Sequence, residues 1–435
     1  MSSAPEAGAP DSGSPDGGSP DGGSRDGGAP VLSGRQHITK ALIAALWTYG
    51  GRGTGLLWTA SLIGQVGVGA YGQYAMAYAA GAILSAPLDN PFAVRAIRES
   101  EDRFVRERSL RVLIALAMII PGLLLTPFSY IVWFGLVASG GEMIFSALKS
   151  RRLRDGHPDV VQRWDTIRQV SAVVLGGAYL YLAPDPSLTV ASILFVIPYL
   201  VVAVLAVWTI RGDRPQFPGP PKIAAVLFGE NLAVALYLQG DVLLLGFLTD
   251  STTVGYYSIA VVCAWALAQV GAALGSTYHE KLRDGDGRVS SGPPMRHTVI
   301  LAAAAGSVLF LAGFVALFLP VATQIAAAMM IMSLFVCLRV VIFVDTVILS
   351  MQRRDIVRSS AYAVVVVIKL AMVAGLVWAG AVGAAIATVI ADIILLTVFT
   401  IALRRPVADP TPDAPAPVAD GVASPTDHEK GPKRR

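Results

Sequence analysis

The feature that most constrains this chain is a series of long apolar runs. Runs such as 170–183, 188–210, 298–349 and 360–403 contain few or no Asp, Glu, Lys or Arg residues. Soluble domains carry roughly 25% charged residues, whereas this chain has 15% charged and 54% hydrophobic residues and a mean hydropathy of +0.60. The apolar region extends from about residue 40 to 404. Because a bilayer core needs about 20 apolar residues per helix, this region has room for about twelve spans. We therefore predict an all-α polytopic membrane protein.

Both ends of the chain differ from this apolar region. Residues 1–34 are mostly Gly, Ser, Pro and Asp, and residues 406–435 are rich in Pro, Ala and Asp. Such segments bury too little apolar surface to offset the entropy lost on ordering. We predict two disordered tails. The first lacks the basic and apolar segments of a signal peptide.

Turn residues such as Thr126-Pro127 and Leu319-Pro320 separate the apolar runs. The resulting spans are expected at 41–63, 69–92, 109–126, 128–148, 167–183, 188–210, 223–248, 254–278, 297–318, 321–348, 359–379 and 381–403.

Lys and Arg residues occur in alternate loops only. They gather near 98–108, 149–154, 211–222, 281–288, 353–358 and 404–405. The opposite loops, near 64–68, 126–128, 184–187, 249–253, 319–320 and 380, contain none. The positive-inside rule then places the basic loops and both termini in the cytoplasm of a cell whose inner membrane the chain spans. An even number of spans agrees with both tails on one side.

A short repeat divides the chain. Gly-Gln-Tyr-Ala-Met-Ala at 72–77 opens the second predicted span, and Gly-Tyr-Tyr-Ser-Ile-Ala at 255–260 opens the eighth. Tyr is enriched at membrane boundaries, so a chance match of such aromatics is the alternative. The positions favour two six-helix lobes related by a parallel pseudo-repeat. We expect an N-terminal lobe at 35–213, a Pro-rich cytoplasmic linker at 214–222 and a C-terminal lobe at 223–405.

At these residues the chain resembles the Wzx-type flippases of O-antigen and exopolysaccharide, which share a superfamily with MurJ and the MATE exporters. The matching stretches are 63–77, 240–246, 254–260, Arg95, 351–354 and 380–387. Gln239 departs from the pattern, because many relatives carry a basic residue at this place before Asp241. The resemblance implies a transporter, not an enzyme. Its cargo would be a polyprenyl-pyrophosphate-linked oligosaccharide moved from the inner to the outer leaflet for polysaccharide or lipopolysaccharide biosynthesis. Membrane lipid, a polysaccharide polymerase and glycosyltransferases would be its partners.

Three cations fall inside predicted spans: Arg52, Arg339 and Lys369. Ionisable groups at bilayer depth cost about 2.5–3.5 kcal/mol on insertion scales, so they normally face a cavity or a partner. Arg offers a fork of donors to phosphate oxygens and Lys a compact charge. We predict these three residues as the pyrophosphate head-group site. The alternative is that some of them form structural pairs or extend towards the membrane surface.

Arg168 and the sequence spacing of Arg339 need separate treatment. Arg168 is expected at the cytoplasmic start of a helix, where an extended side chain reaches the interface, and it is a weaker candidate for the site. Arg339 lies six residues before Asp345. That spacing puts the two on different helix faces, so only a loose pair is expected between them.

The intramembrane acids have two possible roles. Glu230 and Asp241 lie eleven residues apart, about three turns, and so share a helix face. They could bind a coupling proton or sodium ion, or hold the helix through hydrogen bonds, and both readings stay open. Asp89, beside a proline, is expected as a structural cap, while Glu142 and Asp345 are weaker candidates.

Other function classes find little support. The five His residues fall in tails or cytoplasmic loops without metal-ligand spacing, and no Walker motif or nucleophile elbow is present. We expect no metal, no cofactor and no nucleic-acid partner, because membrane topology explains the net charge of +4. The remaining alternatives are a MATE-like cation-coupled exporter of small organic molecules and a non-transporting membrane component of a polysaccharide pathway.

Overall fold

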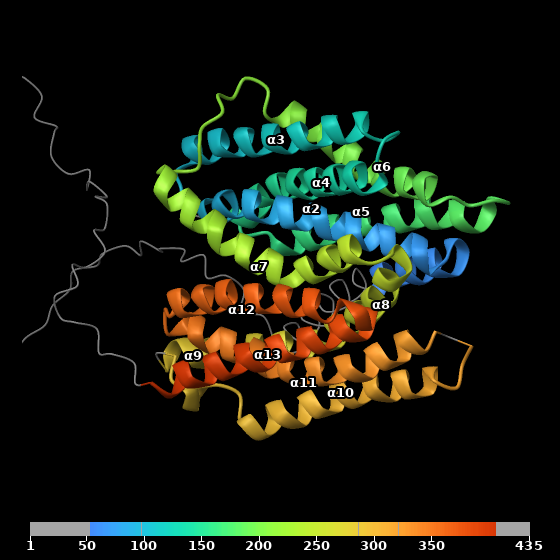
Figure 1. Ribbon diagram of the computed structural model, residues 1–435. Coiled ribbons are helices and arrows are strands. Elements are labelled where there is room, and N and C mark those ends of the chain that lie inside the picture. The colour runs from blue at the N-terminus through green and yellow to red at the C-terminus, as the bar shows by residue number, and fades with distance from the viewer. Residues whose placement is uncertain (1–52, 97, 286, 321, 406–435) are drawn as a thin grey trace, which may run out of the picture. The chain divides into compact units, whose positions relative to one another are not determined.

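The computed structural model describes residues 53–96, 98–285, 287–320 and 322–405, and it contains helices and no strand within them. The predicted tails and Arg52 lie outside the described residues. Figure 1 shows the helices running alongside one another in a layered bundle.

The helices fall into two consecutive sets. The first set is a helical segment at 53–66 followed by α2 (Val68–Arg95), α3 (Glu101–Leu124), α4 (Tyr130–Arg154), α5 (Pro158–Leu182) and α6 (Leu188–Thr209). The second set is α7 (Pro221–Leu248), α8 (Ser251–Thr277), α9 (His279–Asp284), α10 (Met295–Ala316), α11 (Thr323–Met351), α12 (Asp355–Gly375) and α13 (Gly380–Arg404), with short 3-10 turns η1 (Val289–Ser291) and η2 (Val377–Ala379). Each predicted span from 69–92 onward coincides with one of these helices.

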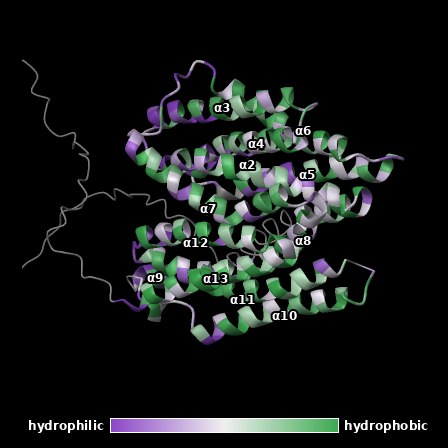
Figure 2. Cartoon of the chain, in the orientation of Figure 1, coloured by the Kyte–Doolittle hydropathy of each residue, from purple (hydrophilic) through white to green (hydrophobic). Residues whose placement is uncertain are grey.

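Hydropathy follows the helices. Eight of the described helices are long and apolar enough to cross a membrane. Helices α2, α3 and α5 have comparable lengths of 28, 24 and 25 residues but include polar turns. Figure 2 shows hydrophilic residues gathered at helix ends, including the first turns of α3. The chain is a multi-pass membrane protein, and the count of twelve spans stays a prediction.

Side chains cap three helices at the loops that lack Lys and Arg. The Ser129 hydroxyl accepts a hydrogen bond from the amide of Val132 at the start of α4. The Ser187 hydroxyl accepts one from the amide of Val190 at the start of α6. The Asp250 carboxylate accepts from the amides of Thr252 at 2.8 Å and Thr253 at 3.0 Å to begin α8. These hydrogen bonds lower the pKa of Asp250. Each cap satisfies amides that a helix start leaves without partners.

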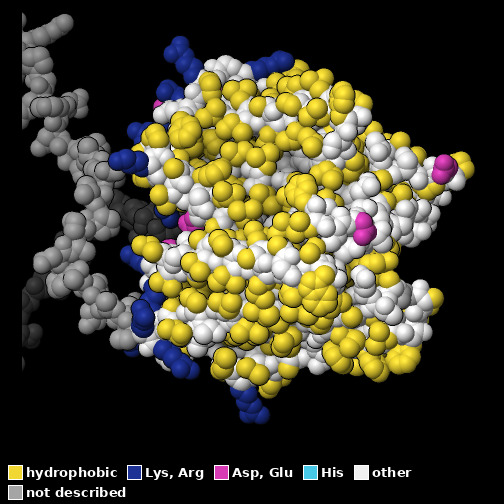
Figure 3. All heavy atoms as spheres, in the orientation of Figure 1, with side chains coloured by type: hydrophobic (Ala, Val, Ile, Leu, Met, Phe, Trp, Pro, Cys, Tyr) yellow, Lys and Arg dark blue, Asp and Glu magenta, His cyan; other side chains and the backbone are white. Residues whose placement is uncertain are grey.

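The surface matches a membrane protein with one basic end. In Figure 3 most visible Lys and Arg side chains lie towards the end where α12 begins, and the face between the two ends is largely hydrophobic. This distribution agrees with the charge asymmetry of the loops. The assignment of the basic end to the cytoplasm stays a prediction.

Helix α2 joins the two sets. It packs on α4 within the first set and on α7 and α8 of the second. Asn90 donates to the carbonyl of Leu227 at 3.0 Å, and Asn231 donates back to the carbonyl of Ala86 at 2.9 Å. Within the second set, α11 packs on α8, α10 and α13, and α12 packs on α7 and α13. The division into lobes at 214–222 stays a prediction.

The two copies of the repeat contact each other. A Cβ atom at Gly72 would overlap the carbonyl oxygen of Ser251, and one at Gly255 would overlap the carbonyl oxygen of Val68. A Cβ at either glycine would thus meet the backbone of the residue that lies four positions before the other glycine. This reciprocal contact gives α2 and α8 a close crossing that only glycine permits on either side.

We expect Gly72→Ala to lower the thermal stability of the purified protein, because the added methyl group forces the two backbones apart. Overpacking of this kind typically costs about 1–3 kcal/mol. Gly64→Ala is the matched control, since a Cβ there would meet nothing within 4 Å. The unfolding midpoint in detergent measures both, and an unchanged midpoint for Gly72→Ala would contradict the close crossing.

Candidate functional site

Arg339 and Asp392 form a buried ion pair between α11 and α13. The Arg339 and Asp392 residues are 1% and 0% exposed. Tyr237 of α7 joins them: Arg339 Nη2 donates to the Tyr237 hydroxyl at 2.6 Å, and this hydroxyl donates to Asp392. The guanidinium also lies against the rings of Trp265 and Phe335, at 5.1 and 5.2 Å from their centroids. Arg339 is therefore held from several sides.

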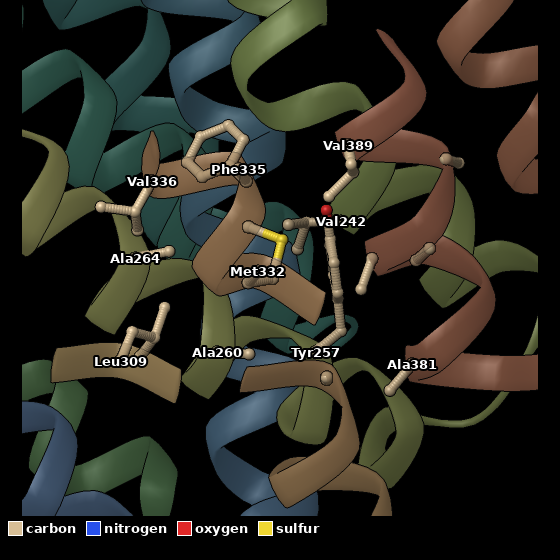
Figure 4. Packing of buried hydrophobic residues seen from close by; sticks show 14 of the residues in the cluster. Val242, Tyr257, Ala260, Ala264, Leu309, Met332, Phe335, Val336, Ala381 and Val389 are labelled. Atoms are coloured by element: carbon tan, nitrogen blue, oxygen red, sulfur yellow. The ribbon is translucent and has the colours of Figure 1, made fainter. Parts of the chain in front are cut away.

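A second buried pair lies beside the first. Lys369 Nζ of α12 is 2.6 Å from Asp241 Oδ2 of α7 and donates to the backbone carbonyl of Tyr237 at 2.8 Å. The same carboxylate oxygen accepts from the hydroxyls of Tyr257 at 2.5 Å and Thr388 at 3.3 Å. Figure 4 shows Tyr257 extending through the apolar core, with its hydroxyl near Val242 and Val389. Together the two pairs contain two cations and two anions, so their formal charge cancels.

The predicted head-group cations Arg339 and Lys369 are thus engaged with acids in this conformation. Arg339 pairs with Asp392 rather than with Asp345, in accord with the helix-face argument. Neither cation is among the described residues that line the large cavity of the molecule. Their predicted role stays a prediction, and it would require these pairs to open.

That cavity has a volume of about 640 Å³ and lies between the two sets of helices. The segment 53–66 and helices α2, α4, α5 and α6 contribute its wall on one side, and α7 and α8 contribute the other. The volume falls in the range of about 300–1,000 Å³ typical of sites for small ligands. The Arg339–Asp392 pair lies behind the wall, because Trp265 contacts Arg339 and also lines the cavity. Lys369 and Asp241 are likewise not among the described residues of the wall.

Aromatic rings form much of the cavity wall. The Trp58 and Phe195 rings stack with centroids 4.7 Å apart, and the Tyr74 ring lies 5.2 Å from Phe134. Tyr78, which is 47% exposed, extends this surface. The amide side chains of the wall are Gln169, Gln239 and Gln269. The site therefore offers flat apolar faces with hydrogen-bonding groups among them.

Glu142 is the one Asp, Glu, Lys or Arg among the described residues that line the cavity. Its carboxylate Oε1 lies 2.9 Å from Arg168 Nη1 and accepts from the Tyr199 hydroxyl at 2.9 Å. Arg168 also donates to Asp165 at 2.8 Å, and its guanidinium stacks on the Tyr199 and Phe145 rings. The Glu142 side chain is 38% exposed while that of Arg168 is 4% exposed. The acid thus faces the cavity with a cation directly behind it.

The structure corrects two sequence predictions. Arg168 was predicted at a cytoplasmic helix start, but α5 begins ten residues earlier, at Pro158. Because α5 begins with a polar stretch, hydropathy does not indicate the first part of this helix. Asp89 was predicted as a cap, but it forms an ion pair with Arg111 of α3, with Oδ2 2.5 Å from Nη2. Helix α2 continues through Pro91 to Arg95, so no helix end lies at Asp89.

The other acids fall in different surroundings. Glu230 accepts from Ser359 at 2.6 Å and lies 3.4 Å from Arg358, both on α12. Glu230 and Asp241 therefore both face α12, as their spacing on one helix indicates. Asp345 is buried at 9% exposure on α11, and no ion pair joins it to another described side chain. A coupling role for these acids stays a prediction.

Arg52 lies outside the described residues, although the next residue, Gly53, lines the cavity. Sequence reasoning missed the aromatic wall and the partners Tyr237 and Arg111. It also did not identify Asp392 as the partner of Arg339. The only signal in the sequence was the presence of isolated acidic and basic residues in apolar runs. Such residues do not reveal which helices are neighbours.

Comparisons with known proteins place the fold. No protein-family model and no curated protein sequence matches the chain. The structure is similar to "Lipid II flippase MurJ, inward closed conformation", with a TM-score of 0.66 and 13% identity over 84% of this chain and 88% of that chain.

Two MOP-superfamily structures are also similar. One is an inward-facing multidrug resistance MATE family transporter, with a TM-score of 0.56 and 13% identity over 83% of this chain and 97% of that chain. The other is a MOP superfamily transporter from Pyrococcus furiosus, with a TM-score of 0.51 and 14% identity over 84% of this chain and 95% of that chain. These neighbours are transporters rather than enzymes. The chain has the fold of the MOP superfamily.

Proposed function

We propose that this chain moves a polyprenyl-pyrophosphate-linked oligosaccharide from the inner to the outer leaflet of the cytoplasmic membrane by alternating access, for assembly of a cell-surface polysaccharide. The fold supports a transporter, and the structural neighbour described as a lipid II flippase carries out a related task. The motifs at 72–77 and 255–260 add the resemblance to polysaccharide flippases.

The observation that carries the proposal is the chemistry of the cavity wall. Sugar rings present C–H faces that pack on aromatic rings and hydroxyls that pair with amides. Rings such as Tyr74, Tyr78 and Phe195 and the three Gln side chains provide both kinds of contact. A polyol without charge suits such a surface.

The pairing of the Glu142 carboxylate distinguishes between a saccharide cargo and an organic cation. An exporter of organic cations needs a carboxylate that is available to the cargo. Glu142 is the acid of the described wall, and Arg168 at 2.9 Å and the Tyr199 hydroxyl at 2.9 Å already neutralise and hold it. This arrangement favours the saccharide over the MATE-like alternative.

The pyrophosphate requires cations beside the sugar cavity. Arg168 lies directly behind Glu142, and its fork of donors would suit phosphate oxygens once its pairs with Glu142 and Asp165 opened. Arg52 precedes the cavity-lining Gly53, and we retain it as a second head-group residue. Arg339 and Lys369 would contribute only if their pairs with Asp392 and Asp241 opened.

We expect Tyr78→Ala to lower surface polysaccharide by about tenfold, which corresponds to a loss of about 1.4 kcal/mol in cargo binding. The gene is deleted from its host, each variant is reintroduced, and polysaccharide is measured together with the amount of protein in the membrane. Tyr78→Phe should retain most of the polysaccharide because it keeps the ring.

Leu84→Ala is the matched control for this test. Leu84 lies on the same helix, is 42% exposed and does not line the cavity. Normal polysaccharide in Tyr78→Ala would exclude its ring from the path of the cargo. Unchanged polysaccharide in the deletion strain, with sensitivity to organic cations instead, would favour the exporter.

A further inference from the structure

The ammonium group of Lys369 lies against two oxygen acceptors of α7. Asp241 Oδ2 lies at 2.6 Å from Nζ and the Tyr237 carbonyl oxygen at 2.8 Å, both on α7. The Tyr257 hydroxyl of α8 and the Thr388 hydroxyl of α13 both reach the same Asp241 oxygen. The Tyr237 ring covers the ammonium, with its centroid 4.9 Å from Nζ. Carboxylate and carbonyl oxygens are also the ligands that hard cations take.

We propose that this cluster is a binding site for a monovalent cation and that Lys369 occupies it as a tethered cation. Lysine suits this position because its charge is compact and carried on a long stem. The stem reaches from α12, whereas both oxygen acceptors belong to α7. Because the hydroxyls of Tyr257 on α8 and Thr388 on α13 donate to the same carboxylate, Asp241 is the point at which these four helices of the second set meet.

Among the described residues, no other cation is paired with these acceptors. Asp241 is 2% exposed and Lys369 is 3% exposed, so bulk ions do not reach the pair in this conformation. The neighbouring guanidinium of Arg339 is paired with Asp392. The other Asp241 oxygen accepts from the amide of Val242 at 2.9 Å. Removing the Lys369 side chain would leave a carboxylate and a carbonyl facing a space of ammonium size.

The proposal has a consequence for coupling. An acid that already holds an internal cation has no need of a sodium ion from solution. The stability and transport of the wild-type chain should therefore not depend on which monovalent cation is present. This inference concerns Asp241 and Lys369 alone and does not rest on the identity of the transported cargo.

The experiment measures the unfolding midpoint of the full-length protein in detergent. The salts are sodium, potassium, methylammonium and choline chloride at equal ionic strength. Wild type should give one midpoint in all four. Lys369→Ala should unfold at lower temperature in choline, and sodium or methylammonium should raise its midpoint by about 5 °C or more, as expected for a ligand well above its Kd.

Two control variants make the test specific. Lys369→Ala/Asp241→Asn removes the carboxylate and should abolish the rise. Lys369→Met fills the space with an apolar chain and should show none. Should Lys369→Ala not accumulate, Lys369→Asn replaces it, because its short side chain also vacates the ammonium position and keeps a polar group in the core. The proposal is overturned if Lys369→Ala, or Lys369→Asn in its place, responds equally to all four salts, if the double variant keeps the rise, or if wild type is stabilised by sodium over choline.

Discussion

Asp392→Leu should deplete folded protein more strongly than the other single substitutions proposed above. It leaves the guanidinium of Arg339, which is 1% exposed, in the core without its carboxylate. Removing one partner of a buried ion pair typically costs about 3–5 kcal/mol. That loss is a large fraction of the free energy of unfolding of a typical protein, about 5–15 kcal/mol. We expect little monodisperse protein when detergent extracts are separated by size, and a clear fall in the unfolding midpoint of what remains.

The double variant Arg339→Met/Asp392→Leu should recover most of that loss, because replacing both partners by apolar side chains removes the unpaired charge. Asp284→Leu is the control: Asp284 is paired with Arg283 at 3.7 Å on the surface, where such pairs contribute about 0–1 kcal/mol. If the double variant is no more stable than Asp392→Leu, the pair is not the reason for the loss.

The same double variant addresses the role of Arg339 in transport. Restored folding with restored polysaccharide would mean that Arg339 serves the structure alone. Restored folding without polysaccharide would support the predicted head-group role.

Arg168→Met should abolish surface polysaccharide while the protein still reaches the membrane. The substitution removes the cation proposed to meet the pyrophosphate, and charged hydrogen bonds of this kind are worth about 2 kcal/mol or more, roughly 30-fold in affinity. Folding should survive, because the Glu142 side chain is 38% exposed to the cavity and can be hydrated there. Polysaccharide and membrane protein are measured in the same cells.

Glu142→Gln gives the opposite expectation and discriminates between the two cargoes. It preserves the shape of the wall and removes one of the two acids paired with Arg168, so saccharide transport should persist. An organic-cation exporter would lose activity in Glu142→Gln and keep it in Arg168→Met. Arg163→Met, an exposed position on the same helix, should leave transport unchanged.

Hydropathy and charge predicted most of the helices, because the cost of exposing polar backbone in lipid leaves few alternatives. The errors lie where polar residues extend a helix beyond its apolar part, as at Arg168 of α5 and Asp89 of α2. Hydropathy identifies the apolar segment of a helix but not the polar helical turns that extend it.

The candidate site was only partly predictable. Arg339 and Lys369 stand out as charges in apolar runs, but their partners depend on which helices are neighbours. Asp392 lies 53 residues from Arg339, and Lys369 bonds Tyr237, which lies 132 residues away. No local pattern encodes such distances. The repeat at Gly72 and Gly255 did mark a real contact, since close backbone approach demands glycine at both places.

The central claim is tested most directly in vesicles that contain the purified protein and a fluorescent polyprenyl-pyrophosphate-linked oligosaccharide. The measurement is the rate at which the labelled sugar becomes accessible to a quencher that does not cross the membrane. We predict a rate well above that of protein-free vesicles, and a return to the protein-free rate with Arg168→Met. Equal rates in wild-type and protein-free vesicles would contradict the proposed function.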